Sequence, residues 1–161
     1  RVLGSKKRLA PVRPSRAPSR DLGCPRNTQA MASNAPFLTQ QLKLLIVDDS
    51  NVIRRRIERS QQIEQLQVVG VASNGVEAIE VFRQTDPDVV TMDITMPEMD
   101  GIECVEQLVA MKPEVLILIV SALADKATAV EAMAKGANGF LNKPFSDRQL
   151  NEALAELIGG A

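Results

Sequence analysis

Five short apolar runs recur along the second part of the chain, and each is followed by a segment with helical periodicity. The runs are four to six residues long and end at charged or turn-forming residues, a pattern that favours strands. They occupy residues 44–47, 68–72, 88–93, 115–120 and 139–142. The segments between them repeat apolar residues at helical spacing, as Leu150, Leu154 and Leu157 do after the last run.

The runs are continuously apolar rather than alternating, which indicates strands buried on both faces of a sheet. Strict alternation of strands and helices predicts parallel strands joined by right-handed crossovers. Five such units in about 120 residues predict an α/β fold with a doubly wound, five-stranded parallel sheet and five helices. We expect the flavodoxin-like strand order 2-1-3-4-5, in a domain that occupies residues 41–160.

Polar side chains stand where four of the five runs end. The first run ends at Asp48 and Asp49, the third at Asp93, the fourth at Ser121 and the fifth at Lys143. The second run ends in an uncharged turn. In the expected order the second strand is an edge, so the other four ends lie side by side. The sequence therefore predicts one polar patch at the carboxyl edge of the sheet, where such sheets bind ligands.

The residue types in this patch indicate phosphoryl chemistry. Like charges about 4 Å apart repel by on the order of 4 kcal/mol at an effective dielectric near 20, so Asp48, Asp49 and Asp93 need a cation. Mg²⁺ suits a site with few carboxylates, retained waters and a phosphoryl oxygen. Lys143 supplies a positive charge and Ser121 a hydroxyl donor for the same phosphoryl group. Asp93 ends the middle strand and is the candidate nucleophile, which would form an aspartyl phosphate.

Four motifs in this order and spacing resemble the receiver domain of two-component response regulators. They are LIVDDS at residues 45–50, MDITMPEMDG at 92–101, VSA at 120–122 and GANGFLNKPF at 136–145. The resemblance covers about residues 42–158. The DITMP form is particularly similar to the single-domain chemotaxis regulators.

The resemblance implies a Mg²⁺-dependent phosphoacceptor site. Asp93 would receive the phosphoryl group from the phosphohistidine of a sensor histidine kinase or phosphotransfer protein. Asp49, Asp93 and the main-chain carbonyl of Thr95 would bind Mg²⁺, and Asp48 would act through a water molecule. Lys143 would pair with a phosphoryl oxygen.

The resemblance also implies a conformational switch. Ser121 would move to donate a hydrogen bond to the phosphoryl group, and Phe140 would turn inward with it. The surface of the fourth helix, fifth strand and fifth helix would then change for a downstream effector protein. Phe140 departs from the tyrosine that is usual there, so this switch lacks a hydroxyl. Lys143–Pro144 would be a cis peptide bond.

Two other functions stay open. An aspartate-nucleophile phosphatase would use a similar site, but it usually carries a second acid two residues after the nucleophile, where Thr95 stands. We therefore expect a phosphoacceptor that assists its own phosphorylation and dephosphorylation, not a turnover enzyme. A phosphorylation-independent binding module would not need to retain the carboxylates and the lysine. Arg54, Arg55 and Arg56 spread around the first helix, and we interpret them as a solvated face, with kinase docking by one of them as a weaker hypothesis.

The first residues differ sharply in charge from the rest. Residues 1–30 hold eight basic residues and one acidic residue, a net charge of +7, whereas the remainder has a net charge of −8. Residues 1–36 contain scattered prolines, serines and arginines without apolar periodicity, so we interpret them as a disordered basic leader or tag-like extension. An organelle transit peptide and a nucleic-acid-binding arm are the alternatives.

Composition narrows the remaining function classes. The chain has no histidine, which excludes His-based triads and most zinc sites within it. It has no Trp and no Tyr, so no base-stacking platform is visible and we expect no DNA binding by the domain. No apolar run approaches the roughly 20 residues of a membrane span, and we expect a cytoplasmic protein. Only the last helix follows Leu150, so we expect either a regulator that acts by contact alone or a piece of a longer protein.

Overall fold

The computed structural model describes residues 40–122, 124 and 126–160. Within them the predicted fold is confirmed, because five parallel strands follow the order β2-β1-β3-β4-β5. The strands are β1 (Leu42–Val47), β2 (Leu66–Ala72), β3 (Val89–Met92), β4 (Leu116–Ala122) and β5 (Gly139–Lys143). The helices are α1 (Asn51–Ser60), α2 (Gly75–Thr85), α3 (Gly101–Met111), α4 (Lys126–Ala134) and α5 (Asp147–Gly159). The leader predicted at residues 1–36 lies outside the described residues.

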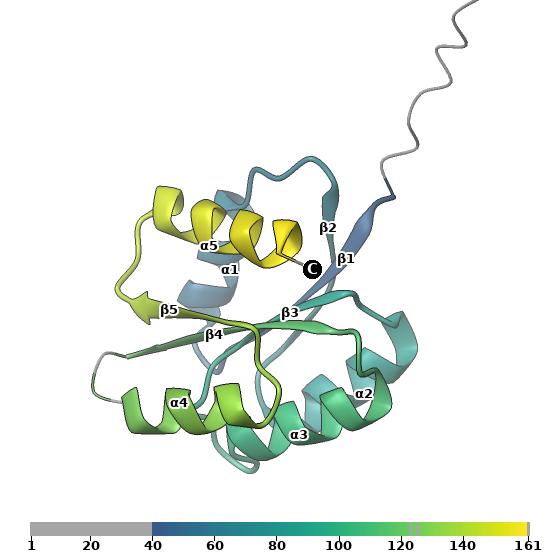
Figure 1. Cartoon of the computed structure of the whole chain (residues 1–161), viewed down its shortest axis with the longest axis vertical. Coiled ribbons are helices and arrows are strands. Elements are labelled where there is room, and N and C mark those ends of the chain that lie inside the picture. The colour runs from purple at the N-terminus through teal and green to yellow at the C-terminus, as the bar shows by residue number, and fades with distance from the viewer. Residues whose placement is uncertain (1–39, 123, 125, 161) are drawn as a thin grey trace, which may run out of the picture. The chain divides into compact units, whose positions relative to one another are not determined.

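The sheet lies between two layers of helices, with α1 and α5 on one face and α2, α3 and α4 on the other (Figure 1). Successive residues of a strand point to opposite faces. In β1, Leu44 and Ile46 join the hydrophobic cluster that contains α1 and α5 residues, while Leu45 and Val47 join the cluster of the other face. Burial on both faces explains why the central strands are continuously apolar.

Side chains fix the starts of three helices at the carboxyl edge of the sheet. Asn74 accepts a hydrogen bond from the first turn of α2, and Asp100 does the same for α3. Ser146 and Gln149 form a reciprocal capping box at the start of α5. Each cap satisfies main-chain N–H groups that the first helical turn leaves without an intrahelical partner. The loops between strands and helices are thereby held in place around the predicted polar patch.

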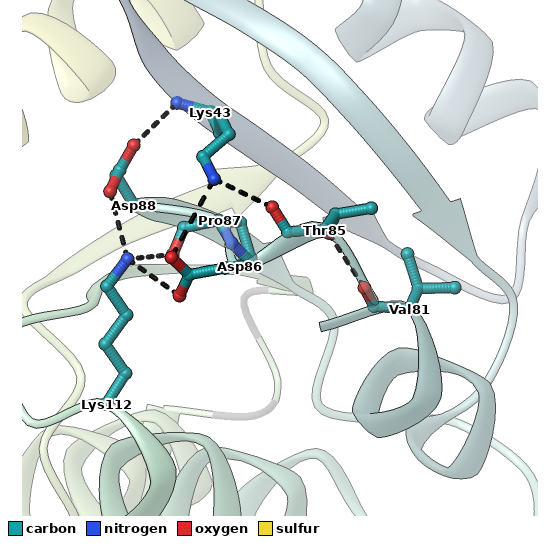
Figure 2. Close-up of polar contacts among 7 residues, drawn as sticks. All are labelled: Lys43, Val81, Thr85, Asp86, Pro87, Asp88 and Lys112. Carbon is teal, nitrogen blue, oxygen red and sulfur yellow. Dashed lines mark hydrogen bonds and ion pairs between the residues drawn. The ribbon is translucent and has the colours of Figure 1, made fainter. Parts of the chain in front are cut away.

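A network of ionic contacts and hydrogen bonds joins strand β1 with the α2–β3 and α3–β4 connections at the opposite edge of the sheet (Figure 2). The Lys112 ammonium, just after α3, donates to Asp86 at 3.2 Å and to Asp88 at 3.0 Å. The second carboxylate oxygen of Asp88 accepts the main-chain N–H of Lys43 in β1 at 2.9 Å. The Lys43 ammonium in turn donates to the carbonyl of Thr85 at the end of α2. Asp88 precedes β3 directly, so this network fixes where the central strand begins.

Asp88→Asn tests how much this network stabilises the fold. Burial alone would raise the pKa of Asp88, but the Lys43 N–H and the Lys112 ammonium outweigh it, and the pKa is lowered from 3.8. A lowered pKa means that the charged form contributes stability above pH 3.8, which is lost as the pH falls further. At pH 7 the variant should be less stable by about 1 kcal/mol in urea unfolding, and the gap should narrow below about pH 4.

Asp86→Asn is the matched control for this measurement. The Asp86 side chain is 70% exposed, against 29% for Asp88, although both contact Lys112. An exposed ion pair contributes only about 0–1 kcal/mol, so the control should lose less stability than Asp88→Asn. An equal loss in both variants would contradict a special role for Asp88.

Thr91 places a hydroxyl group inside the core at the middle of β3. Thr91 is 1% exposed, and its hydroxyl has no hydrogen-bond partner among the described residues. Thr85, by contrast, donates its hydroxyl to the carbonyl of Val81 at 2.8 Å (Figure 2). A buried polar group without a partner costs free energy of folding.

Thr91→Val should therefore stabilise the protein, because valine has nearly the same shape and no hydroxyl to desolvate. We expect a gain of about 1 kcal/mol in the free energy of unfolding, measured by urea denaturation. The same change at Thr85, which loses a hydrogen bond, should bring no gain. A loss of stability in Thr91→Val would show that its hydroxyl is satisfied in solution.

Candidate functional site

Three of the predicted residues meet at the carboxyl edge of the sheet. The Lys143 ammonium, from the end of β5, lies 2.7 Å from a carboxylate oxygen of Asp48 and 3.2 Å from one of Asp93. Asp48 follows β1 and Asp93 follows β3, and these residues are 0% and 4% exposed. Two buried carboxylates from adjacent strands thus share one lysine.

Asp49 completes an acidic cluster on the solvent side. One carboxylate oxygen each from Asp48, Asp49 and Asp93 can be chosen so that all three lie within 4.8 Å of one another. Asp49 is exposed, whereas Asp48 already accepts the Ser50 N–H at 2.8 Å and pairs with Lys143. Carboxylate oxygens gathered in this way suit a hard divalent cation such as Mg²⁺, which keeps several waters. The donor set therefore fits the cation that the sequence predicts.

Burial makes the charge of Asp93 costly. Desolvation is the largest cause that raises the pKa of Asp93 from 3.8 to about 6, and the neighbouring charge of Asp48 adds to it while Lys143 opposes it. Burial alone would lower the pKa of Lys143, but the hydrogen bond and charge of Asp48, together with Asp93, raise it. The pocket therefore holds a charged ammonium beside a carboxylate that would gain from a further cation.

The remaining predicted residues lie around this cluster at different depths. Ser121 is fully buried at the end of β4, the strand between those that supply Asp93 and Lys143. Thr95 is exposed in the loop after β3, and its N–H lies 3.4 Å from Asp93 Oδ1. Phe140 is half-buried in β5 and packs against the core cluster that contains α3 and α4. The expected cis peptide bond between Lys143 and Pro144 is present.

Gly101 allows α3 to begin directly against the candidate nucleophile. A Cβ atom at Gly101 would collide with the carbonyl oxygen of Asp93 and would lie 2.6 Å from the Cα of Ile94. The Gly101 N–H also donates to the Ile94 carbonyl at 3.0 Å. Sequence reasoning used this glycine only as part of a motif and as a helix start, since close backbone approach is invisible without the fold.

Arg54 was interpreted from the sequence as part of a solvated face, and the structure places it differently. It is half-buried, and its Nη1 donates to the main-chain carbonyl of Asp48. Arg55 is exposed, as expected. Arg56 is also exposed, but its guanidinium lies 5.2 Å from the ring centre of Phe145 and 3.7 Å from Asp147. The three arginines therefore differ in their contacts although they follow one another in sequence.

A doubly wound parallel sheet with clustered acids and a lysine at its carboxyl edge is the arrangement that the sequence predicts for a receiver domain. The family model for the response regulator receiver domain matches residues 44–155, and the chain belongs to this family. The chemotaxis protein CheY of Listeria monocytogenes is 42% identical over 113 residues, which cover 70% of this chain and 95% of that protein. Among the described residues, no helix combines the length and the hydrophobicity that a membrane span requires.

Solved structures agree with this assignment. The response regulator domain of Thermotoga maritima CheB matches with a TM-score of 0.64 and 36% identity, covering 74% of this chain and 95% of that one. CheY in the CheX-CheY-BeF3-Mg complex from Borrelia burgdorferi matches with a TM-score of 0.68 and 28% identity, covering 73% and 89%. The similarity to chemotaxis receivers extends from sequence to fold.

Asp93→Asn should raise the stability of the metal-free protein at neutral pH. A raised pKa means that wild type loses stability as the pH rises from about 3.8 to about 6, because the charged carboxylate is poorly solvated. Asparagine carries no charge, so the variant should be more stable by on the order of 2 kcal/mol at pH 7 in EDTA.

The pH dependence of this stability difference serves as an internal control. The difference in stability between variant and wild type should shrink as the pH falls from about 6 toward 3.8, and it should vanish below 3.8, where Asp93 is protonated in both the folded and the unfolded state. Adding MgCl₂ should stabilise wild type more than the variant. A variant that is less stable than wild type at pH 7 in EDTA would show that Asp93 is not under electrostatic strain.

Proposed function

We propose that Asp93 accepts a phosphoryl group from the phosphohistidine of a sensor histidine kinase or phosphotransfer protein. Receiver domains act in two-component signalling, and the chain belongs to that family. The observation that carries the residue assignment is the pairing of Lys143 with two buried carboxylates beside a third acid. Asp93 is central because it follows β3, the middle strand of the sheet.

In the proposed reaction an Asp93 carboxylate oxygen attacks the phosphorus atom. A new oxygen–phosphorus bond forms as the nitrogen–phosphorus bond to the donor imidazole breaks, and the imidazole leaves with the electron pair. Lys143 then pairs with a phosphoryl oxygen in place of the Asp93 carboxylate. Asp49, Asp93 and the Thr95 carbonyl would hold Mg²⁺, and Asp48 would act through a water molecule. The cation, when bound, would neutralise charge on the transferred group.

The proposed output is a change of the surface formed by α4, β5 and α5. Ser121 stands near the end of β4, and Phe140 lies in β5, where it is half-buried against the core. A hydrogen bond from Ser121 to the phosphoryl group would draw the loop after β4 inward and make room for Phe140. A downstream effector protein would bind one of the two surfaces more tightly, and this difference in affinity transmits the signal. Kinase and effector would meet this domain in the cytoplasm.

Turnover of a substrate is not part of the proposal. Thr95 stands two residues after Asp93, where aspartate-nucleophile phosphatases carry a general acid. A hydroxyl cannot replace a carboxyl group as a proton donor near neutral pH. The domain would instead assist its own phosphorylation and dephosphorylation. A binding module that works without phosphorylation is disfavoured by the lysine and the three acids, which serve no packing purpose that apolar residues could not fill.

Intact-mass measurement after incubation with acetyl phosphate tests the assignment. Wild type should gain one phosphoryl group in the presence of Mg²⁺ and none in EDTA, because charge on the group must be neutralised during transfer. Asp93→Asn should gain none. Asp86→Asn, which removes an acid from the opposite edge of the sheet, should be labelled as wild type is.

Two results would contradict the proposal. Labelling of Asp93→Asn would place the phosphoryl group elsewhere. Wild type that neither gains mass nor binds beryllofluoride with Mg²⁺ would indicate a receiver that acts without phosphorylation.

Lys143→Met should slow labelling by at least tenfold if its ammonium stabilises the transferred group.

A further inference from the structure

Arg54 reaches back from α1 to the loop that carries two of the acids. Its Nη1 donates to the main-chain carbonyl of Asp48, which belongs to the peptide unit between Asp48 and Asp49. This peptide unit joins the Cα atoms from which both carboxylates branch, so its orientation affects where they lie. Asp48 is further restrained by the Ser50 N–H at its Oδ1 and by Lys143 at its Oδ2. Arg54 is thus the side chain that restrains the peptide unit itself.

The charge of Arg54 also interacts with Glu77 at the start of α2. Glu77, in the first turn of α2, accepts the hydroxyl of Ser73 at 2.6 Å and its N–H at 2.7 Å. These two contacts are the largest causes that lower the pKa of Glu77, and the charge of Arg54 lowers it further. Asn74 accepts the Glu77 N–H and caps α2. A fixed carboxylate therefore attracts Arg54 from the side of β2.

Arg54 thus donates to the loop after β1, while its charge is attracted by Glu77 at the start of α2. A guanidinium suits this role because its planar fork offers several donors in fixed directions. A lysine at the same position would be a single point charge on a flexible stem. Arg59, one turn further along α1, is exposed and carries the same charge. Comparing variants of Arg54 and Arg59 therefore separates the effect of the side chain's position from the effect of its charge.

We propose that Arg54 is a positioning residue of the acidic pocket, which sets the Asp48–Asp49 peptide unit so that the carboxylates converge on a divalent cation. This inference rests on the proposed Mg²⁺ site. It concerns a residue that touches neither the cation nor the phosphoryl group. Groups that orient metal-binding side chains commonly change metal affinity 10–100-fold when they are removed.

The loss of the positive charge and the loss of the contact with Asp48 should change the Mg²⁺ affinity of Arg54→Met in opposite directions. Removing a positive charge near an acidic pocket, by charge alone, would tighten the binding of a cation. Removing the restraint on the Asp48–Asp49 peptide unit would weaken it. We expect the Mg²⁺ dissociation constant of Arg54→Met to rise about tenfold, measured by titrating the ¹⁵N-labelled full chain with MgCl₂ and following amide chemical shifts.

Arg59→Met is the matched control, because it removes the same charge from the same helix. Its dissociation constant should stay equal to that of wild type or fall slightly. Arg54→Lys keeps the charge but loses the fork, so its binding should still be weaker than that of wild type. Thermal unfolding shows whether each variant is folded, and Arg54→Lys remains available if Arg54→Met is not.

The outcomes separate this inference from the proposed function. Wild type that shows no Mg²⁺-dependent shifts would overturn the proposed cation site itself. Wild type that binds Mg²⁺, with Arg54→Met binding equally or more tightly, would overturn the positioning role alone. Weaker binding in both Arg54→Met and Arg59→Met would assign the effect to a general disturbance of α1 rather than to the contact between Arg54 and the Asp48 carbonyl, and would also overturn the positioning role.

Discussion

The Lys143 ammonium is the contact on which the pocket depends. It lies within 3.2 Å of two carboxylates that are almost fully buried. Buried charges are stable only when they are paired, and removing one partner leaves the other uncompensated. Lys143 is the last residue of β5, which brings it to the same edge of the sheet as the acids that follow β1 and β3. The parallel order of the strands is what gathers groups so distant in sequence.

The two edges of the sheet have different tasks. At the carboxyl edge, Asp93 carries a charge that the fold tolerates at a cost, as its raised pKa shows. At the opposite edge, Asp88 pairs with Lys112 and the Lys43 N–H, and its pKa is lowered. β3 is only four residues long, with Asp88 directly before it and Asp93 directly after it. Stabilising contacts at its start therefore help to hold the unfavourable charge at its end.

Hydrophobic patterning and the rule for strand ends predicted the sheet and the place of its acids and lysine. Patterning failed where the fold creates the environment. β2 begins at Leu66, earlier than the apolar run, because an edge strand tolerates the exposed Gln67. The ion pairs of Lys112 join segments that only tertiary structure brings together. Helical spacing also could not show that the Arg54 side chain turns toward Asp48, since a long side chain reaches beyond its own turn.

The charges of the pocket explain why a cation and a phosphoryl group belong to the same site. Three carboxylates and one ammonium leave a net charge of about −2, which one divalent cation balances. Phosphorylation of Asp93 would replace a single charge by a phosphoryl group that carries nearly two. Lys143 and the cation would then both face the phosphoryl group, whose negative charge is larger than that of the Asp93 carboxylate. The same lysine that relieves the repulsion between the acids would thus hold the phosphoryl group. Its change of partner would link the chemistry at the end of β3 to β5, the strand that carries the lysine.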